Sequence, residues 1–198
     1  MSQTFDAPAP DADVIIAGAG MAGVTLALAL KSGGLRPVLV DPLVFETQIA
    51  PEFDGRASAI AFACFRQWRT LGAGAAIEPH AQRIEQILVT DGRSPGAAQG
   101  RPSPAYLRFD SAEIAERSGG EPLGYLVENR HIRSGLAQAA KAAGIEVLAP
   151  ARVAKVEVGP AAVSVTLDDG RTLRAPLVVG SDGRRSLVRE AAGINVVG

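Results

Sequence analysis

The chain has 198 residues, of which 47% are hydrophobic and 21% charged, and its formal net charge is −1. These proportions exclude a disordered polar chain, and the length suits one large or two small domains. The sequence contains no basic block, which argues against nucleic acid as a partner. Cys64 is the single cysteine, so a disulfide within the chain is excluded and a reducing compartment is favoured.

The first residues of the sequence differ from the pattern of a secretory signal. Residues 1–12 have neither a basic start nor a long apolar run, so we expect a flexible leader and no secretory signal. The longest apolar stretches are interrupted by Gly, Lys or Asp before they reach the length of a membrane span. We therefore expect a cytoplasmic protein, for which a peripheral association with the membrane stays open.

A strand, a helix and a second strand are predicted next. The apolar run at 13–17 is typical of a buried parallel strand. Residues 21–32 are rich in Ala and Leu and predict a helix that ends at Gly33-Gly34. Residues 37–41 predict the second strand. This βαβ order is the context that a nucleotide-binding turn requires.

The middle of the chain predicts one long helix and a small sheet. Residues 43–55 are polar and predict irregular structure, whereas residues 56–71 are rich in alanine and predict a helix. On that helix we expect Cys64, Phe65 and Trp68 to be packed in the core. Strands of a small separate sheet are predicted at 84–90, 106–109 and 125–127. A turn is predicted at Asp91-Gly92 and a loop at 93–104.

The last third of the chain predicts a helix, a strand and an antiparallel meander. Residues 131–143 predict the helix and 145–148 the strand. Apolar and polar residues alternate from 152 to 175 around the turn Asp168-Asp169-Gly170, which predicts three antiparallel strands. Residues 176–180 predict a final buried strand.

These elements together predict an α/β protein with a Rossmann-like fold, in which a parallel sheet is joined to the three-stranded meander. We expect one domain to be formed by 13–81 and 128–198, and 82–127 to form part of a second, smaller sheet.

Gly18-Ala19-Gly20-Met21-Ala22-Gly23 follows the first predicted strand directly. In a dinucleotide-binding turn, the first glycine allows a tight turn and the second lets the backbone approach a pyrophosphate. The third lets the helix pack closely on the sheet, and the helix N-terminus offers free N–H groups to the phosphates. A glycine-rich turn without a ligand is the alternative.

Asp41 stands at the end of the second predicted strand. Its carboxylate could accept hydrogen bonds from both hydroxyls of an adenosine ribose, which favours FAD or NAD over NADP. Arg56 begins the next predicted helix and could reach phosphate oxygens as a fixed cation. The alternative for Arg56 is a solvated side chain near a helix start.

Five sequence features together resemble one enzyme family. They are the glycine turn, Asp41, Asp54–Ala61, Gly124–Asn129 and Gly180-Ser181-Asp182-Gly183 with Ser186 and Arg189 after it. In this order they resemble the FAD-dependent hydroxylases of ubiquinone biosynthesis, which belong to the group A flavin monooxygenases. The resemblance covers residues 12–195.

The resemblance implies an FAD-binding site and assigns residues to it. The residues implied to contact FAD are Gly18, Ala19, Gly20, Ala22, Gly23, Asp41, Arg56, Ala57, Asn129, Val153, Asp182 and Gly183. Asn129, with Arg130 as its alternative, would place a polar side chain near FAD, and Val153 would meet the adenine through its backbone. Asp182 and Gly183 would lie near FAD and along the path of the nicotinamide.

Three arginines accompany the last motif. Arg189 would anchor it through a salt bridge, whereas Arg184 and Arg185 are expected to be surface charges.

The implied activity is hydroxylation of an aromatic ring, most closely that of a ubiquinone precursor such as a polyprenyl phenol or benzoquinol. In such enzymes NAD(P)H reduces FAD, and O2 then adds to give a C4a-hydroperoxide whose terminal oxygen is transferred to the ring. The cofactor carries this chemistry, so no catalytic side chain is assigned.

Three alternatives stay open. They are a hydroxylase of another small aromatic compound, a non-catalytic domain that binds FAD or another nucleotide, and an NAD-dependent dehydrogenase. The dehydrogenase leaves Asp182-Gly183 and the inserted sheet unexplained. His80 and His131 are isolated, so we expect solvated or capping histidines and no metal site.

The sequence departs from the family pattern at two points. Asp41 stands where the family usually has Glu, one methylene longer. The family's second Gly-Asp motif has no counterpart, because the sequence contains no Gly-Asp dipeptide. We therefore expect the N-terminal part of such an enzyme, with exposed apolar surface and a tendency to self-associate or to join a ubiquinone-biosynthesis complex.

Overall fold

The computed structural model describes residues 9–50, 52, 54–90 and 106–197. Its centre is a four-stranded parallel sheet in the order β12-β1-β2-β8. The four strands are β1 (Val14–Ala17), β2 (Pro37–Val40), β8 (Glu146–Leu148) and β12 (Leu177–Gly180). β1 and β2 are buried along their whole length, as expected for central strands of a parallel sheet.

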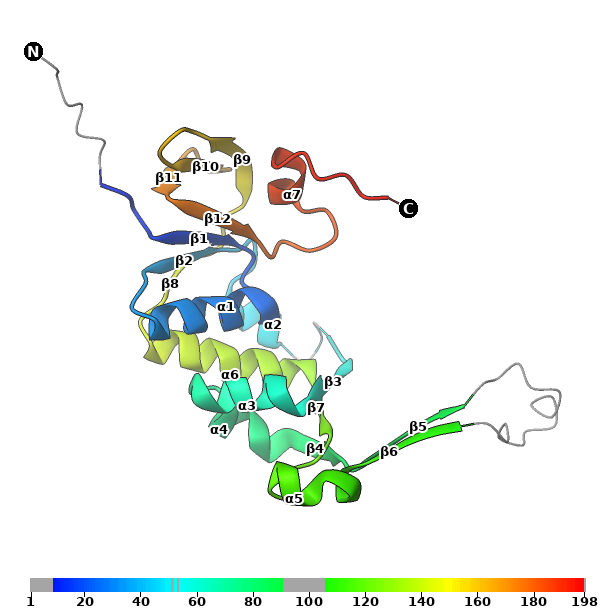
Figure 1. The fold of residues 1–198 in the computed structure, drawn as a ribbon. Coiled ribbons are helices and arrows are strands. Elements are labelled where there is room, and N and C mark those ends of the chain that lie inside the picture. Colours follow the sequence, from blue (N-terminus) through cyan, green and yellow to red (C-terminus); the bar gives the residue numbers. More distant parts are fainter. Residues whose placement is uncertain (1–8, 51, 53, 91–105, 198) are drawn as a thin grey trace, which may run out of the picture.

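The two faces of this sheet carry different layers (Figure 1). Successive side chains of a strand point to opposite faces, so Val14 and Ile16 of β1 join one core and Ile15 joins another. Helices α1 (Met21–Ser32) and α6 (Asn129–Ala142) cover the first face, and the meander covers the second. The predicted Rossmann-like arrangement of parallel sheet, helices and meander is confirmed.

The meander consists of β9 (Val153–Val158), β10 (Val163–Leu167) and β11 (Thr172–Ala175) in the order β11-β10-β9. Gly170, with a φ of +87°, donates its N–H to the carbonyl of Leu167 at 3.1 Å and closes the predicted turn. The meander is confirmed.

The end of the predicted leader is bound to this meander. Asp11 donates its N–H to the carbonyl of Arg174 at 2.9 Å, and its carboxylate accepts the N–H of Arg174 at 2.7 Å. The expectation of flexibility is therefore wrong at Asp11 and at the buried Ala12. The earlier residues of that leader, 1–8, lie outside the described ranges, as do the turn and loop expected between 91 and 104.

The helix predicted for 56–71 begins only at Phe62. Its expected first part is a strand, β3 (Ala57–Ala61), which pairs antiparallel with β7 (Gly124–Glu128). β4 (Ala81–Ile84) flanks β7 on the other side. Pairing with β7 satisfies the backbone groups of β3, and this tertiary contact overrides the helix propensity of alanine.

The helix α3 (Phe62–Thr70) buries one face only. Phe65 and Trp68, three residues apart, are buried, and Trp68 Nε1 donates to Thr25 Oγ1 of α1 at 2.9 Å. Cys64, on the same helix, is exposed to solvent. The expected packing of Phe65 and Trp68 is confirmed, and the expected burial of Cys64 is wrong.

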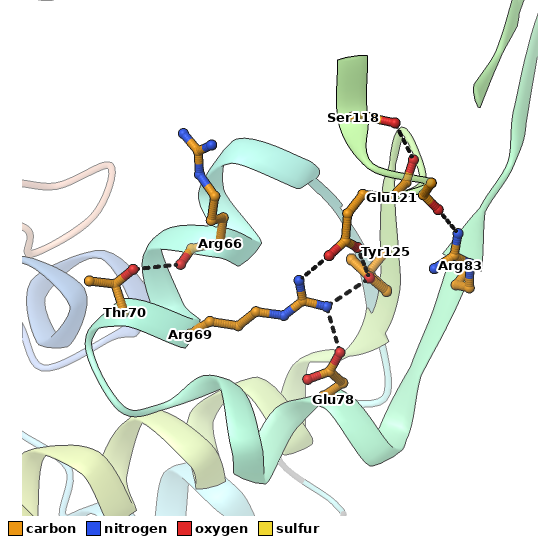
Figure 2. Close-up of polar contacts among 9 residues, drawn as sticks. Arg66, Arg69, Thr70, Glu78, Arg83, Ser118, Glu121 and Tyr125 are labelled. Carbon is orange, nitrogen blue, oxygen red and sulfur yellow. Dashed lines mark hydrogen bonds and ion pairs between the residues drawn. The ribbon is translucent and has the colours of Figure 1, made fainter. Parts of the chain in front are cut away.

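Arg69 in the last turn of α3 joins that helix to the β3-β7-β4 sheet (Figure 2). Its guanidinium donates to Glu121 at 2.6 Å, to Glu78 at 2.5 Å and to the Tyr125 hydroxyl at 3.0 Å. The bond from Arg69, and after it the bond from the Tyr125 hydroxyl, hold the pKa of Glu121 below its usual range. Burial raises the pKa of Tyr125. The rings of Phe65 and Tyr125 lie against each other, with centroids 4.2 Å apart and planes tilted by 30°.

A two-stranded ribbon extends from the body (Figure 1). It pairs β5 (Gln86–Thr90) with β6 (Tyr106–Asp110). The opposed pairs Ile87–Phe109 and Val89–Leu107 share one face, and all four side chains are exposed. The expected exposed apolar surface is found here, and self-association stays a prediction.

The strands expected to form one small sheet belong to two separate sheets. The single strand predicted for 84–90 is divided between β4 and β5. β7 pairs with β3 and β4 and is separate from the ribbon. The strand predicted for 125–127 therefore belongs to the three-stranded sheet, because its partners are Ala57–Ala61 and Ala81–Ile84.

Two further expectations are corrected. Residues 43–55 are not wholly irregular, because α2 (Phe45–Ile49) packs on α6 and buries Gln48, whose Nε2 donates to the carbonyl of Leu43 at 3.1 Å. β12 is not fully buried, since it forms the edge of the parallel sheet and exposes Leu177.

The remaining short helices are α4 (Gly74–Ile77), η1 (Glu78–His80), η3 (Ser111–Ile114), α5 (Ala115–Ser118) and α7 (Leu187–Ala191). In the part of the chain that the structure describes, no helix has the length and apolar character needed to cross a membrane.

Candidate functional site

A cleft of about 480 Å³ opens where β1, β2 and β12 end. Ligands of open α/β sheets bind at these carboxyl ends. Its lining consists of Ala17, Gly18, Gly20, Val40, Asp41, Pro42, Ala151, Arg152, Val153, Ser181, Asp182, Gly183, Arg185 and Leu187. The cleft thus brings together the glycine turn, Asp41, Val153 and the Asp182-Gly183 motif, which are far apart in the sequence.

The three glycines of the turn meet different surroundings. Gly18 has a φ of +102°, and a Cβ there would lie 2.3 Å from the carbonyl oxygen of Ser181. A Cβ on Gly23 would lie 1.9 Å from the carbonyl oxygen of Gly18. A Cβ on Gly20 would meet no atom of the described residues within 4 Å. Gly18 and Gly23 are therefore required by packing, whereas Gly20 leaves open space beside the cleft.

Gly20 is also the N-cap of α1, and no side chain caps it. The first N–H groups of a helix have no partner within the helix. The first turn of α1, all of it described, contains no acidic residue. Free N–H groups and the positive helix end therefore suit an anion, which fits the pyrophosphate of a dinucleotide.

Asp41 is a buried carboxylate that ties the glycine turn to the end of β2. Its Oδ2 accepts the N–H of Ala19 at 2.7 Å, and its Oδ1 accepts the N–H of Leu43 at 2.8 Å. A carboxylate oxygen has two acceptor sites, so these bonds leave capacity for a hydroxyl donor in the cleft.

The Asp182-Gly183 motif forms another part of the cleft lining. Asp182 Oδ2 accepts the N–H of Leu187 at 2.8 Å, and Asp182 Oδ1 is buried without a hydrogen-bond partner among the described residues. Buried acceptors are normally satisfied, so this atom also fits a cleft that takes a ligand. Gly183 has a φ of +83°.

Arg184 and Arg185 lie at the surface as expected, whereas within the described residues Arg189 does not anchor the motif through a salt bridge. Arg184 and Arg185 are exposed, although Arg185 lines the cleft. Arg189 donates to the carbonyl of Arg184 at 2.8 Å and forms an ion pair with Glu190 at 3.4 Å. The shorter bond shows that Arg189 holds the loop chiefly through a backbone carbonyl.

Arg56 and Asn129 lie in a second cluster, around the buried Asp54. Asp54 accepts from Arg56 Nε at 2.8 Å, from Asn129 Nδ2 at 2.9 Å and from Arg133 Nη2 at 2.9 Å. These bonds hold the pKa of Asp54 far below its usual range, and the bond from Arg56 has the largest effect. The Ser58 hydroxyl donates to Asn129 Oδ1 at 2.6 Å, so both polar atoms of Asn129 are bonded within the protein.

The structure therefore divides the sequence-predicted residues. Gly18, Gly20, Asp41, Val153, Asp182 and Gly183 line the cleft, whereas Arg56, Ala57 and Asn129 do not. Ala19 and Gly23 act through backbone contacts behind it, and Ala22 lies in the first turn of α1. Arg152 and Arg133 carry no signal in the sequence that marks them out. Asp54 was visible in Asp54-Gly55-Arg56, but its link to α6 required the fold.

His80 and His131 stack on each other, with ring centroids 3.7 Å apart and an interplanar angle of 7°. His80 is exposed, as expected for a solvated side chain, whereas His131 is partly buried. The stacking itself was not expected, because it depends on η1 and the start of α6 lying side by side. Among the described residues, no group of His, Cys, Asp and Glu could hold a metal ion.

Acidification is expected to destabilise the protein through His131. Burial, then His80 and Arg130, lower its pKa, and Glu128 opposes them. As the pH falls, the imidazole of the unfolded chain therefore takes up a proton before that of the folded chain. The contribution of His131 to the unfolding free energy is complete above the unfolded pKa of about 6.5 and is lost as the pH falls below it. Urea unfolding at pH 7.5 and 5.5 should show a smaller loss of unfolding free energy in His131→Gln. An equal loss in both proteins would contradict this assignment.

Residues 11–198 match a family model described as an FAD binding domain. The chain is 42% identical over 186 residues to the ubiquinone hydroxylase UbiL of Rhodospirillum rubrum, covering 93% of this chain and 40% of that protein. It is 30% identical over 188 residues to the 3-demethoxyubiquinol 3-hydroxylase of Escherichia coli, covering 93% of this chain and 44% of that protein. The chain thus spans about two fifths of the length of these relatives.

Solved structures show the same fold. Anhydrotetracycline hydroxylase OxyS from Streptomyces rimosus matches 94% of this chain with a TM-score of 0.71 and 23% identity, over 34% of its own length. The p-nitrophenol 4-monooxygenase PnpA from Pseudomonas putida matches 92% with a TM-score of 0.73 and 21% identity, over 43% of its own length. The cleft geometry and the family match lead to one conclusion: this chain belongs to the family of FAD binding domains, as the resemblance implied.

Proposed function

We propose that this chain is the FAD-binding part of a flavin-dependent monooxygenase that hydroxylates the aromatic ring of a ubiquinone precursor, a polyprenyl phenol or benzoquinol. NAD(P)H and O2 are the co-substrates. The observation that carries the proposal is the cleft shared by the glycine turn and the Asp182-Gly183 motif, in a chain similar to UbiL. A polyprenyl substrate is lipid-soluble, so the proposed place of action is the cytoplasmic surface of a membrane.

Each wall of the cleft has a proposed task. The N–H groups at the start of α1 bind the pyrophosphate, with Gly20 leaving the approach open. Asp41 accepts a ribose hydroxyl while it holds the glycine turn, and the backbone at Val153 bounds the adenine. Asp182 and Gly183 face the flavin side. FAD, when bound, supplies the redox chemistry that activates O2.

The proposed domain division follows from the same assignment. Residues 13–81 and 128–198 bind FAD, and residues 82–127, which include the exposed ribbon, contribute to the substrate side. In this proposal Arg56, Ala57 and Asn129 lie along the path of the flavin beyond the cleft.

Titration of the purified chain with FAD tests the proposal. We expect saturable binding near one FAD per chain, followed by the change in flavin fluorescence and in the visible spectrum, with no comparable affinity for NAD. Preference for NAD over FAD would favour the dehydrogenase alternative, and absence of binding to either would contradict the assigned site. An NADH or NADPH oxidation assay of the loaded protein then separates an active hydroxylase part from a domain that only binds FAD.

A further inference from the structure

The side chain of Arg133 lies beside the start of α1. It extends from the first half of α6, and its side chain is only 13% exposed. It lines a small hollow with Ala19, Gly20 and Met21 from the glycine turn and with Gln48 from α2. Gly20 also lines the main cleft. A partly buried arginine thus lines the same hollow as the residue that leaves room for a ligand.

A positive charge such as that of Arg133 is unfavourable near the N-terminus of α1. The N-terminus of a helix is positive, so it stabilises anions and disfavours cations. The glycine turn therefore combines free N–H groups, a positive helix end and a guanidinium in one place. A phosphate-bearing ligand would offset all three, because guanidinium groups bind phosphate through paired, charge-assisted hydrogen bonds.

Asp54 keeps the guanidinium in that place. Its Oδ2 accepts from Arg133 Nη2 at 2.9 Å and from Asn129 Nδ2 at 2.9 Å, so one oxygen is bonded to two side chains of α6. Arg56 fixes the carboxylate itself, through its N–H at 3.1 Å and its Nε at 2.8 Å. A guanidinium held in advance loses less conformational freedom when a ligand binds.

We infer that Arg133 binds the pyrophosphate of the dinucleotide and that Asp54 is the residue that positions it. This inference rests on the proposed function, since it adds one cation and its support to the FAD site. It gives the Asp54 cluster a role on the cofactor, although the cluster does not line the main cleft.

Calorimetric titration with ADP, adenosine and FAD tests the inference on the full chain. Arg133→Met should weaken ADP and FAD about tenfold or more, and adenosine, which has no phosphate, less than about twofold. Lys141→Met is the matched control, because Lys141 is an exposed cation in the last turn of the same helix and should leave all three affinities unchanged. Asp54→Asn should weaken ADP selectively, by about threefold.

The outcomes separate the inference from the proposed function. If the wild-type chain binds ADP and FAD but Arg133→Met binds them equally well, or loses adenosine to the same extent, the inference is wrong and the proposed function stands. If the wild-type chain binds neither ADP nor FAD, both are wrong. Thermal melting without ligand checks each fold. If Arg133→Met melts early, Arg133→Gln, which can still donate to Asp54, must show the same selective loss.

Discussion

Gly20→Val is expected to weaken FAD binding by at least ~100-fold, which corresponds to about 2.7 kcal/mol, while the protein still folds. A Cβ at this position meets no atom of the described residues within 4 Å. The backbone, with φ −73°, suits any residue. The valine side chain therefore occupies the space through which the pyrophosphate would approach the N–H groups of α1. Loss of a favourable N-cap should cost no more than about 1 kcal/mol.

Fluorescence titration with FAD and thermal melting without FAD check this expectation together. Gly33→Val is the matched control, since Gly33 is the C-cap at the other end of the same helix, with φ −83° and its nearest neighbour at an ordinary 3.4 Å. That variant should bind FAD like the wild type. Retention of tight FAD binding by Gly20→Val would show that the pyrophosphate does not lie at the glycine turn.

Gly23→Ala is expected to lose about 3 kcal/mol or more of unfolding free energy, because the added methyl would lie 1.9 Å from the carbonyl oxygen of Gly18. Neither atom can move away cheaply. Gly23 is on the helix, and Gly18 is held by a bond from its N–H to the carbonyl of Val40 at 2.7 Å. The contact must instead be relieved by separation of α1 from β1, which opens the core around Ile16.

Thermal melting should show this loss as a fall of about 6–12 °C or more. Gly20→Ala, which adds the same methyl group three residues earlier without any contact within 4 Å among the described residues, is the control and should melt close to the wild type. A melting temperature for Gly23→Ala within about 2 °C of the wild type would mean that the close approach of α1 to β1 is absent in solution.

The central βαβ unit could be predicted because its signals are local. An apolar run marks β1, and a glycine turn and Gly33-Gly34 mark the two ends of α1. The structure places α1 at the predicted residues Met21–Ser32. The meander was equally local, since Gly170 marks its turn. Membership in the family of FAD binding domains was anticipated from five motifs. The glycine turn, Asp41 and Asp182-Gly183 follow strand ends, whereas the other two motifs include the strands β3 and β7.

The errors concern contacts between distant segments. Ala57–Ala61 is a strand only because Gly124–Glu128 pairs with it, and no window around Ala57 contains that information. The stacking of His80 on His131 and the bonds of Asn129 to Asp54 and Ser58 likewise depend on where α6 begins. The roles assigned to individual residues toward FAD stay predictions, which the variants above test.

The central position of β1 in the sheet affects how the protein folds during translation. Among the described strands β1 comes first in the sequence, yet one of its two neighbours, β12, comes last. During translation this central strand is therefore left half-paired until residues 177–180 emerge, and the wall formed by Asp182 follows later still. Pairing across so much intervening chain is entropically costly and slow. A nucleotide that touches both the glycine turn and the Asp182 segment would hold these distant segments together and so favour the folded state.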